Sequence, residues 1–166
     1  MAEQRRPLRR TAVAVAAVLV AAGLTGCGGT KSYCSALKDD KPRLTKLAAR
    51  SAEPGATGGK ALGETVDVLA GLADRAPDDI KDEWDTLVQA LRGLSDAIRE
   101  SGADPGDFAG GAKPDGVSAG QLDAVQQAAH ELQDLRVQQA GTSIEQHARD
   151  VCKVDLGSSG LGGSVG

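Results

Sequence analysis

The segment from Ile80 to Ile98 carries the pattern that most constrains how this chain folds. Its apolar side chains recur at spacings of four, three, four, three and four residues: Ile80, Trp84, Leu87, Leu91, Leu94 and Ile98. This is the a/d seam of almost three heptads, which an α-helix buries along one side. Pro77 suits the first position of a helix and Gly102 suits its end, so we predict a helix over residues 77–101.

Composition favours further helices rather than sheets. Gly and Ala are abundant, β-branched residues are sparse, and the aromatic residues are Tyr33, Trp84 and Phe108. The residue types that stabilise a sheet are therefore scarce. Apolar residues at helical spacing predict two earlier helices, over residues 32–52 and 60–75.

Pro42 lies within the first of these segments, and two interpretations follow. Either the proline kinks one long helix, or it stands at the start of a second helix that Asp40 caps. Because the apolar face stays in phase across Pro42, we favour one kinked helix.

The last helix is expected to begin at a capping box and to be interrupted later. Ser118 and Gln121 stand three residues apart before an apolar stripe, as in a capping box. We expect Gly141 to break this helix and Ser143 to cap its final segment. The predicted fold is therefore all-α: a four-helix bundle whose last helix is broken near Gly141.

Two segments are expected to lie outside the helices. Residues 102–117 are rich in Gly, Pro and Asp and predict a long loop, with Phe108 packed on the bundle. A loop of this length is either functional or disordered. Residues 157–166 are rich in Gly and Ser and predict a disordered tail, which leaves residues 32–156 as the bundle domain.

The amino terminus has the layout of a cleaved export signal. Arg5, Arg6, Arg9 and Arg10 precede an apolar run over residues 12–24. A transmembrane helix is the alternative, but a span needs about 20 apolar residues and this run is shorter. We therefore expect cleavage, with Sec and twin-arginine export both open.

The apolar run ends in a motif that resembles the lipobox of bacterial lipoproteins: Leu24, Thr25, Gly26 and Cys27. In that motif the cysteine thiol receives a diacylglyceryl group and becomes the new amino terminus. The resemblance implies a signal peptide over residues 1–26 and a lipid anchor with a short tether over residues 27–31. It also implies a location on the extracytoplasmic face of the cell membrane.

Lysines follow this anchor closely. Lys31, Lys38 and Lys41 lie in the segment nearest the membrane, where each could gain about 1 kcal/mol from anionic lipid. The alternative is that they are ordinary solvated lysines.

The chain contains three cysteines, so at least one of them cannot take part in a disulfide within the chain. If Cys27 carries the lipid, Cys34 and Cys152 remain as a pair in an oxidising compartment. We predict a disulfide between them, which would join the first helix to the last. Closing a loop of this length contributes up to about 5 kcal/mol in the chain-entropy model.

The histidine spacing gives little support for a metal site, and the sequence lacks the common catalytic motifs. His130 and Asp134, and likewise His147 and Asp150, have helical spacing. Metal sites in bundles draw their ligands from several helices, so we expect two solvated histidines. No HExxH, GxSxG or phosphate-loop pattern occurs. We expect no catalytic residue, no metal and no cofactor.

The acidic cluster over residues 78–85 and the tryptophan within it each have two interpretations. The cluster could bind calcium, but it lacks the ligand order of a loop site and suits the positive end of a helix dipole. Trp84 could anchor a partner, but its place on the heptad seam favours a core role. The net charge is −4, and removing the leader's +3 leaves −7, which argues against nucleic acid as a partner.

Several segments together resemble a family of small actinobacterial helical lipoproteins: the motif ending at Cys27, and the segments Tyr33–Lys38, Ala76–Trp84 and His147–Cys152. The shared features are a lipobox, an early Tyr-Cys pair, an acidic helix with a tryptophan, and a late cysteine. The resemblance implies the location and the fold, and it implies no catalytic or binding residues.

These observations favour a non-enzymatic function. We expect an interaction or accessory module of the cell envelope, held to the membrane through Cys27, with an envelope protein as its partner. The alternative is a lipoprotein that binds a small ligand in a pocket between helices.

Overall fold

The computed structural model describes residues 26–51, 57–108 and 112–157. Over these residues the chain is all-helical, without a strand, and it contains five α-helices and one short 3-10 helix. In chain order they are α1 (Gly26–Ser51), α2 (Thr57–Ala73), α3 (Lys81–Ser101), η1 (Pro105–Phe108), α4 (Ala119–Leu132) and α5 (Leu135–Asp150). The all-α prediction is confirmed, whereas the expected count of four helices is wrong.

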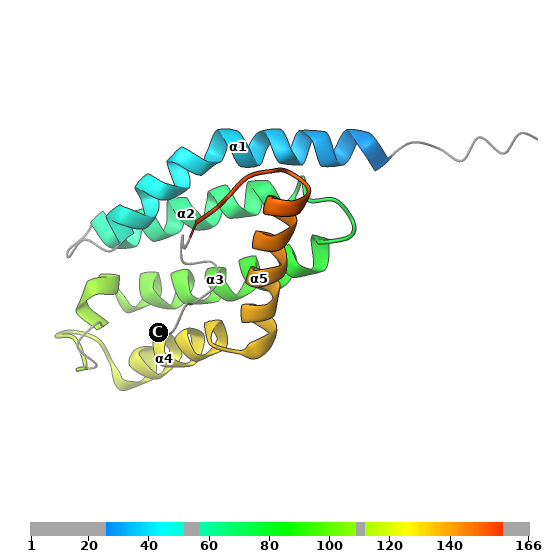
Figure 1. Cartoon of the computed structure of the whole chain (residues 1–166). Helices are drawn as coiled ribbons and strands as arrows, with labels where there is room; N and C mark the ends of the chain where they lie inside the picture. Colours follow the sequence, from blue (N-terminus) through cyan, green and yellow to red (C-terminus); the bar gives the residue numbers. More distant parts are fainter. Residues whose placement is uncertain (1–25, 52–56, 109–111, 158–166) are drawn as a thin grey trace, which may run out of the picture.

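The first four α-helices pack in chain order, and the fifth crosses α3. Helix α1 packs on α2, α2 on α3, and α3 on both α4 and α5. In Figure 1, α1 and α4 lie at opposite edges of the molecule, and α5 runs across the end of α3 towards α1. The last residues of the described chain, 151–157, return from α5 and run between α1 and α2 in this view; we call this segment the C-terminal strap.

The break in the last helical segment lies earlier than expected. Helix α4 ends at Leu132 and α5 begins at Leu135, with Asp134 as the N-cap. Gly141, the expected break, is buried inside α5. A glycine within a helix costs about 1 kcal/mol relative to alanine, and burial of neighbours such as Val137 and Ile144 offsets that cost. Ser143 accordingly lies within α5 and does not cap a separate helix.

The capping box at the start of α4 is confirmed. Ser118 Oγ accepts a hydrogen bond from the backbone N–H of Gln121 at 3.2 Å, and the Gln121 side chain accepts one from the backbone N–H of Ser118 at 2.9 Å. The two side chains satisfy backbone donors that the first turn of a helix leaves without partners.

The apolar seam of α3 is buried as expected, although the helix begins later. Residues 77–80 form a turn, in which the backbone N–H of Ile80 donates to the carbonyl of Pro77 at 3.1 Å. Trp84 and Leu87 are fully buried and Leu91 and Leu94 are half-buried. Helix α3 ends at Gly102, whose φ of 73° is the left-handed conformation that glycine adopts without strain.

Helix α1 is longer than expected at its amino-terminal end. It runs through Pro42 without interruption, so the prediction of one helix across the proline is confirmed. Residues 27–31, expected to form a tether, are helical and belong to α1. Residues 1–25 of the expected signal peptide, including Leu24 and Thr25, lie outside the described residues, as does the expected tail from residue 158 onward; Gly26, the last residue of that expected peptide, is the first residue of α1.

The core lies where α1, α2, α3 and α5 meet. Its largest fully buried side chains are Trp84, Tyr33, Leu37, Leu69, Leu72 and Ile144. The strap closes this core, because Cys152, Val154 and Leu156 are buried against it. In the loop after α3, Phe108 is half-buried at the end of η1, and residues 109–111 lie outside the described residues.

Candidate functional site

A disulfide joins the start of the domain to its end. Cys34 of α1 and Cys152 of the strap are bonded, with an S–S distance of 2.02 Å and their Cα atoms 5.0 Å apart. This confirms the predicted pairing. It also leaves Cys27, in the first turn of α1, as the third cysteine of the chain.

An open groove of about 470 Å³ lies beside the disulfide. One wall is α1 and the other is the strap, and the lining residues are Thr30, Lys31, Cys34, Ser35, Lys38, Val151, Cys152 and Lys153. We call this feature the lysine groove, because three of its side chains are lysines and none is acidic. Both bonded cysteines line the groove, so the disulfide links its two walls covalently.

The α1 wall presents its lysines in a regular register. Lys31, Cys34 and Lys38 are spaced by three and four residues, so they lie on one face of the helix. Lys31 and Lys38 are exposed, and among the described residues neither forms an ion pair with a carboxylate. Cys27 precedes Lys31 by one helical turn. The groove therefore begins directly after the residue expected to carry the lipid.

The strap wall is held in place by the end of α5. Lys153 adopts a left-handed backbone conformation with φ of 55°, which turns the chain back towards α1. Its ammonium group donates a hydrogen bond to the carbonyl of Asp150 at 2.8 Å, and a cation at this end of a helix is favoured by the helix dipole. The backbone N–H of Val154 donates to the carbonyl of Ala148 at 2.9 Å. Val151 is 48% exposed, since α5 ends at Asp150 and Val151 is its C-cap.

A buried cluster of three rings lies behind the disulfide. Trp84 donates its indole N–H to the hydroxyl of Tyr33 at 3.0 Å, and the two rings meet edge to face with centroids 6.2 Å apart. The imidazole of His147 also contacts the ring of Tyr33, with the two ring centroids 5.7 Å apart. Burial raises the pKa of Tyr33 to about 12; the hydrogen bond from Trp84 opposes this shift and the charge of Asp79 adds to it. Tyr33 is therefore a neutral hydroxyl at neutral pH.

The two histidines differ from one another. His130 is exposed, as expected, whereas His147 is buried and the expectation of a solvated side chain is wrong. His147 Nε2 lies 3.6 Å from a carboxylate oxygen of Asp79, and its Nδ1 is buried without a hydrogen-bond partner. Its spacing of three residues from the buried Ile144 is the signal in the sequence that would have placed it inside.

The acidic cluster at the start of α3 is divided among different contacts. Asp79 lies against His147, Lys81 forms an ion pair with Asp85 at 3.6 Å, and Asp82 lies in the first turn of α3. Over the parts of the chain that the structure describes, no three His, Cys, Asp or Glu side chains are grouped so as to hold a metal ion. The helix-dipole interpretation of this cluster fits the positions of its members.

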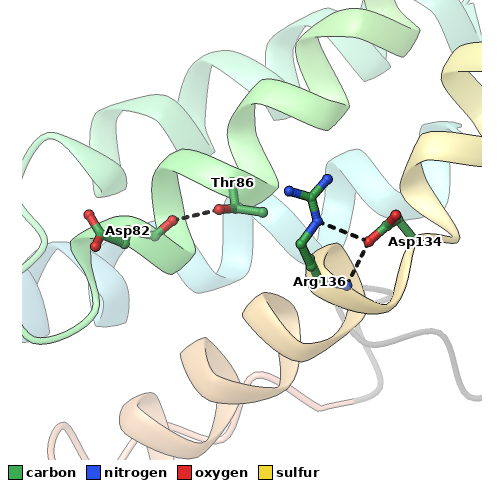
Figure 2. Close-up of polar contacts among 4 residues, drawn as sticks. All are labelled: Asp82, Thr86, Asp134 and Arg136. Carbon is green, nitrogen blue, oxygen red and sulfur yellow. Dashed lines mark hydrogen bonds and ion pairs between the residues drawn. The ribbon is translucent and has the colours of Figure 1, made fainter.

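An open cleft of about 280 Å³ is lined by residues of α3 and α5, and Figure 2 shows the polar contacts of four residues in this region. On the α5 side, Arg136 lies against the N-cap Asp134, whose carboxylate accepts hydrogen bonds from the Arg136 backbone N–H at 2.8 Å and from its guanidinium at 3.4 Å. The backbone hydrogen bond is the main reason that the pKa of Asp134 is lowered. On the α3 side, Thr86 donates to the carbonyl of Asp82 at 2.8 Å. These contacts belong to local helix structure, and they leave the cleft with mixed charge.

A second groove, of about 380 Å³, lies between α2 and the end of α3. Lys60, Arg99 and Asp104 place both signs of charge around it, and Leu62 and Ile98 provide apolar surface. This groove has the mixture of apolar and polar groups that small-ligand sites use.

Charge is distributed unevenly between α1 and the rest of the chain. Helix α1 contains six Lys and Arg residues and two Asp residues, a formal charge of +4. Residues 52–166 contain nine basic and twenty acidic residues, a formal charge of −11. The lysine groove is therefore at the basic edge of an otherwise acidic protein.

Comparison with protein-family models, with curated proteins and with solved structures finds no match to this chain. Among the helices of the described residues, none has the length and apolar character needed to cross a bilayer.

Proposed function

We propose that this protein is an extracytoplasmic lipoprotein that acts as a non-enzymatic interaction module of the cell envelope. The observation that carries the proposal is the pairing of Cys34 with Cys152, which leaves Cys27 as the cysteine available for a lipid. Disulfides persist in oxidising compartments, so the bond supports export. The resemblance of residues 24–27 to a lipobox, and of the longer segments to small actinobacterial lipoproteins, supports the same location.

The acidic part of the molecule supports the interaction role. Helix α4 lies at the edge opposite to α1, the helix that begins at the proposed anchor (Figure 1). At the corner between α4 and α5, Glu131 and Asp134 are exposed, and Leu135 is 76% exposed between them and Arg136. An apolar side chain rimmed by charges is a common arrangement at protein interfaces. A partner with a basic surface would be complementary to this corner.

The proposal is tested in two steps on the protein expressed from its full gene. Mass spectrometry of the amino-terminal peptide should show cleavage before Cys27 and a diacylglyceryl group on its sulfur, both lost in Cys27→Ser. Cross-linking in intact cells should then capture an envelope partner with the wild-type protein and lose it with Leu135→Asp. The control is Gln126→Asp, which adds the same charge at an exposed position of α4 and should retain the partner. An unmodified Cys27, or a partner retained equally by Leu135→Asp, would contradict the proposal.

The groove between α2 and α3 favours one alternative, a lipoprotein that binds a small ligand. Its two cations, Lys60 and Arg99, would suit an anionic metabolite. Binding would raise the midpoint of thermal unfolding with a metabolite pool, and Lys60→Gln would remove that shift.

A further inference from the structure

We propose that the lysine groove binds the phosphate headgroups of anionic phospholipids, so that α1 lies against the membrane surface. The inference rests on the proposed function, because it requires the amino-terminal end of α1 to be held at a bilayer. It goes further by assigning a ligand class and by fixing which face of the domain is turned to the membrane.

The position of the groove is the first argument. Lys31 follows Cys27 by four residues, about 6 Å of rise along the helix axis. Residues 27–31 are helical rather than extended, so the anchor and the α1 wall of the groove belong to the same helix. A lipid on Cys27 therefore holds the groove at the depth of the headgroups.

The chemistry of the lining is the second argument. Lys31, Lys38 and Lys153 come from two segments that the disulfide brings together, and the groove contains no acidic side chain. A lysine near an anionic membrane gains about a fivefold preference for the surface, and the gains of several lysines multiply. Thr30 and Ser35 add hydroxyl groups to the lining.

Val151 is the third argument. This side chain is 48% exposed at the rim of the groove, although it is large and apolar. At a membrane surface, apolar side chains beside a cationic face enter the boundary between headgroups and acyl chains. Exposed Val151 beside three lysines is thus suited to an interface that is anionic outside and apolar beneath.

The acidity of the rest of the chain opposes docking only weakly. Neighbouring helices pack at about 8–10 Å between axes, so charges beyond α2 are farther from the membrane than one Debye length, about 8 Å at physiological ionic strength. The net negative charge of residues 52–166 disfavours their approach to an anionic surface, so it also favours contact through the basic α1.

The experiment measures lysine reactivity on vesicles. Among the residues that the structure describes, the buried core lies between Tyr33 and Leu156, so residues 27–166 contain this core in full. With Cys34 and Cys152 oxidised, the Cys27 thiol of this chain is coupled to a maleimide phospholipid in vesicles of phosphatidylcholine, with or without an equal amount of phosphatidylglycerol. A water-soluble amine-acylating reagent then labels the lysines, and mass spectrometry gives the rate at each position.

We expect Lys31 and Lys38 to react at least about tenfold more slowly on the anionic vesicles, since two lysines together favour the docked state by about 25-fold. Lys60 and Lys113, on other parts of the fold, are the internal controls and should react equally on both kinds of vesicle. In Lys31→Gln/Lys38→Gln, Lys153 should lose its protection, whereas Arg92→Gln/Lys113→Gln, with the same change in net charge, should retain protection at Lys31, Lys38 and Lys153.

Equal reactivity of Lys31 and Lys38 on the two vesicles would overturn the inference, as would protection of Lys60 and Lys113 to the same extent. Inorganic phosphate added to the neutral vesicles distinguishes the source of the phosphate: protection of the groove by phosphate alone would overturn the assignment to a bilayer. Because the lipid is coupled chemically, these outcomes do not depend on acylation in the cell. An unmodified Cys27 in vivo contradicts the proposed function, and unprotected lysines contradict only the docking.

Discussion

The indole N–H of Trp84 donates a hydrogen bond to the hydroxyl of Tyr33 at 3.0 Å. The two residues are 51 positions apart in the sequence, on α3 and α1, and both side chains are fully buried. Tyr33 is the neighbour of Cys34, so the hydrogen bond and the disulfide fasten the same turn of α1. One bond attaches that turn to α3 and the other attaches it to the strap. The five predictions that follow test this arrangement and the helices around it.

Tyr33→Phe should destabilise the domain by about 1–3 kcal/mol, because it leaves the buried Trp84 N–H without an acceptor. The ring packing is retained, so the loss reports the hydrogen bond rather than a cavity. Urea unfolding followed by tryptophan fluorescence gives the free energy of unfolding. A change below a few tenths of a kcal/mol would show that the bond contributes nothing net.

Alkaline pH should destabilise the wild-type protein through the same residue. The pKa of Tyr33 is raised to about 12 in the folded state, from 10.0. Between these values the unfolded chain loses the tyrosine proton while the folded protein keeps it, so stability present below pH 10 falls by about 1.4 kcal/mol per pH unit up to about pH 12. Tyr33→Phe removes this contribution to stability. The difference between the pH profiles of the two proteins therefore separates the effect of Tyr33 from that of the lysines, which titrate in the same pH range. Parallel profiles would contradict the assignment.

Loss of the disulfide should cost about 2–5 kcal/mol, because the bond closes a loop with a sequence separation of 118 residues. Cys34→Ser/Cys152→Ser gives the cost from urea unfolding. The wild type with a reductant should unfold at the same midpoint as this variant, whereas the variant itself should not respond to reductant. A reductant effect on the variant would point to another cause.

Two glycines associated with α3 should respond oppositely to alanine. A Cβ at Gly93, an exposed position within the helix, would meet no atom within 4 Å, so Gly93→Ala should stabilise by about 1 kcal/mol. Gly102 has φ of 73° at the C-cap, so Gly102→Ala should destabilise by about 1 kcal/mol despite the open space around it. Thermal unfolding of the pair measures both signs. The same sign in both variants would contradict the backbone argument.

Asp134→Ala should destabilise the start of α5, whereas Asp134→Asn should retain most of the stability, because asparagine also caps helices well. The pKa of this carboxyl is lowered by its hydrogen bond from the Arg136 backbone N–H. Its contribution is therefore present above the unfolded pKa and is lost as the pH falls through the folded value. Hydrogen exchange of the first-turn amides of α5 measures the effect. An Asp134→Asn variant that frays as much as Asp134→Ala would assign the effect to charge instead.

Local pattern was sufficient to predict the helices that have one strong signal each. The seam from Ile80 to Ile98 and the capping box at Ser118 both act within a few residues, and both are present in the structure. The cysteine pair was predictable from parity once Cys27 was set aside, because only one pairing remained.

The features that were missed depend on contacts distant in sequence. A glycine at position 141 carries a cost of about 1 kcal/mol, which burial of α5 against α3 outweighs, so the break falls at Asp134 where a cap is available. His147 was expected in solvent because its partners, Tyr33 and Asp79, lie on segments far away in the chain. The third lysine of the groove, Lys153, reaches α1 only because the strap turns back after α5.

The position of the disulfide also determines how the molecule would bear mechanical load. A pulling force applied between an anchor at Cys27 and the carboxyl terminus would travel from residue 27 to Cys34, through the sulfur atoms, and out along the strap from Cys152. The helices between the two cysteines lie outside that path and carry none of the tension. The domain would remain folded under forces that separate the packed helices of a domain without such a bond, and reduction of the disulfide would transfer the whole load to helix packing.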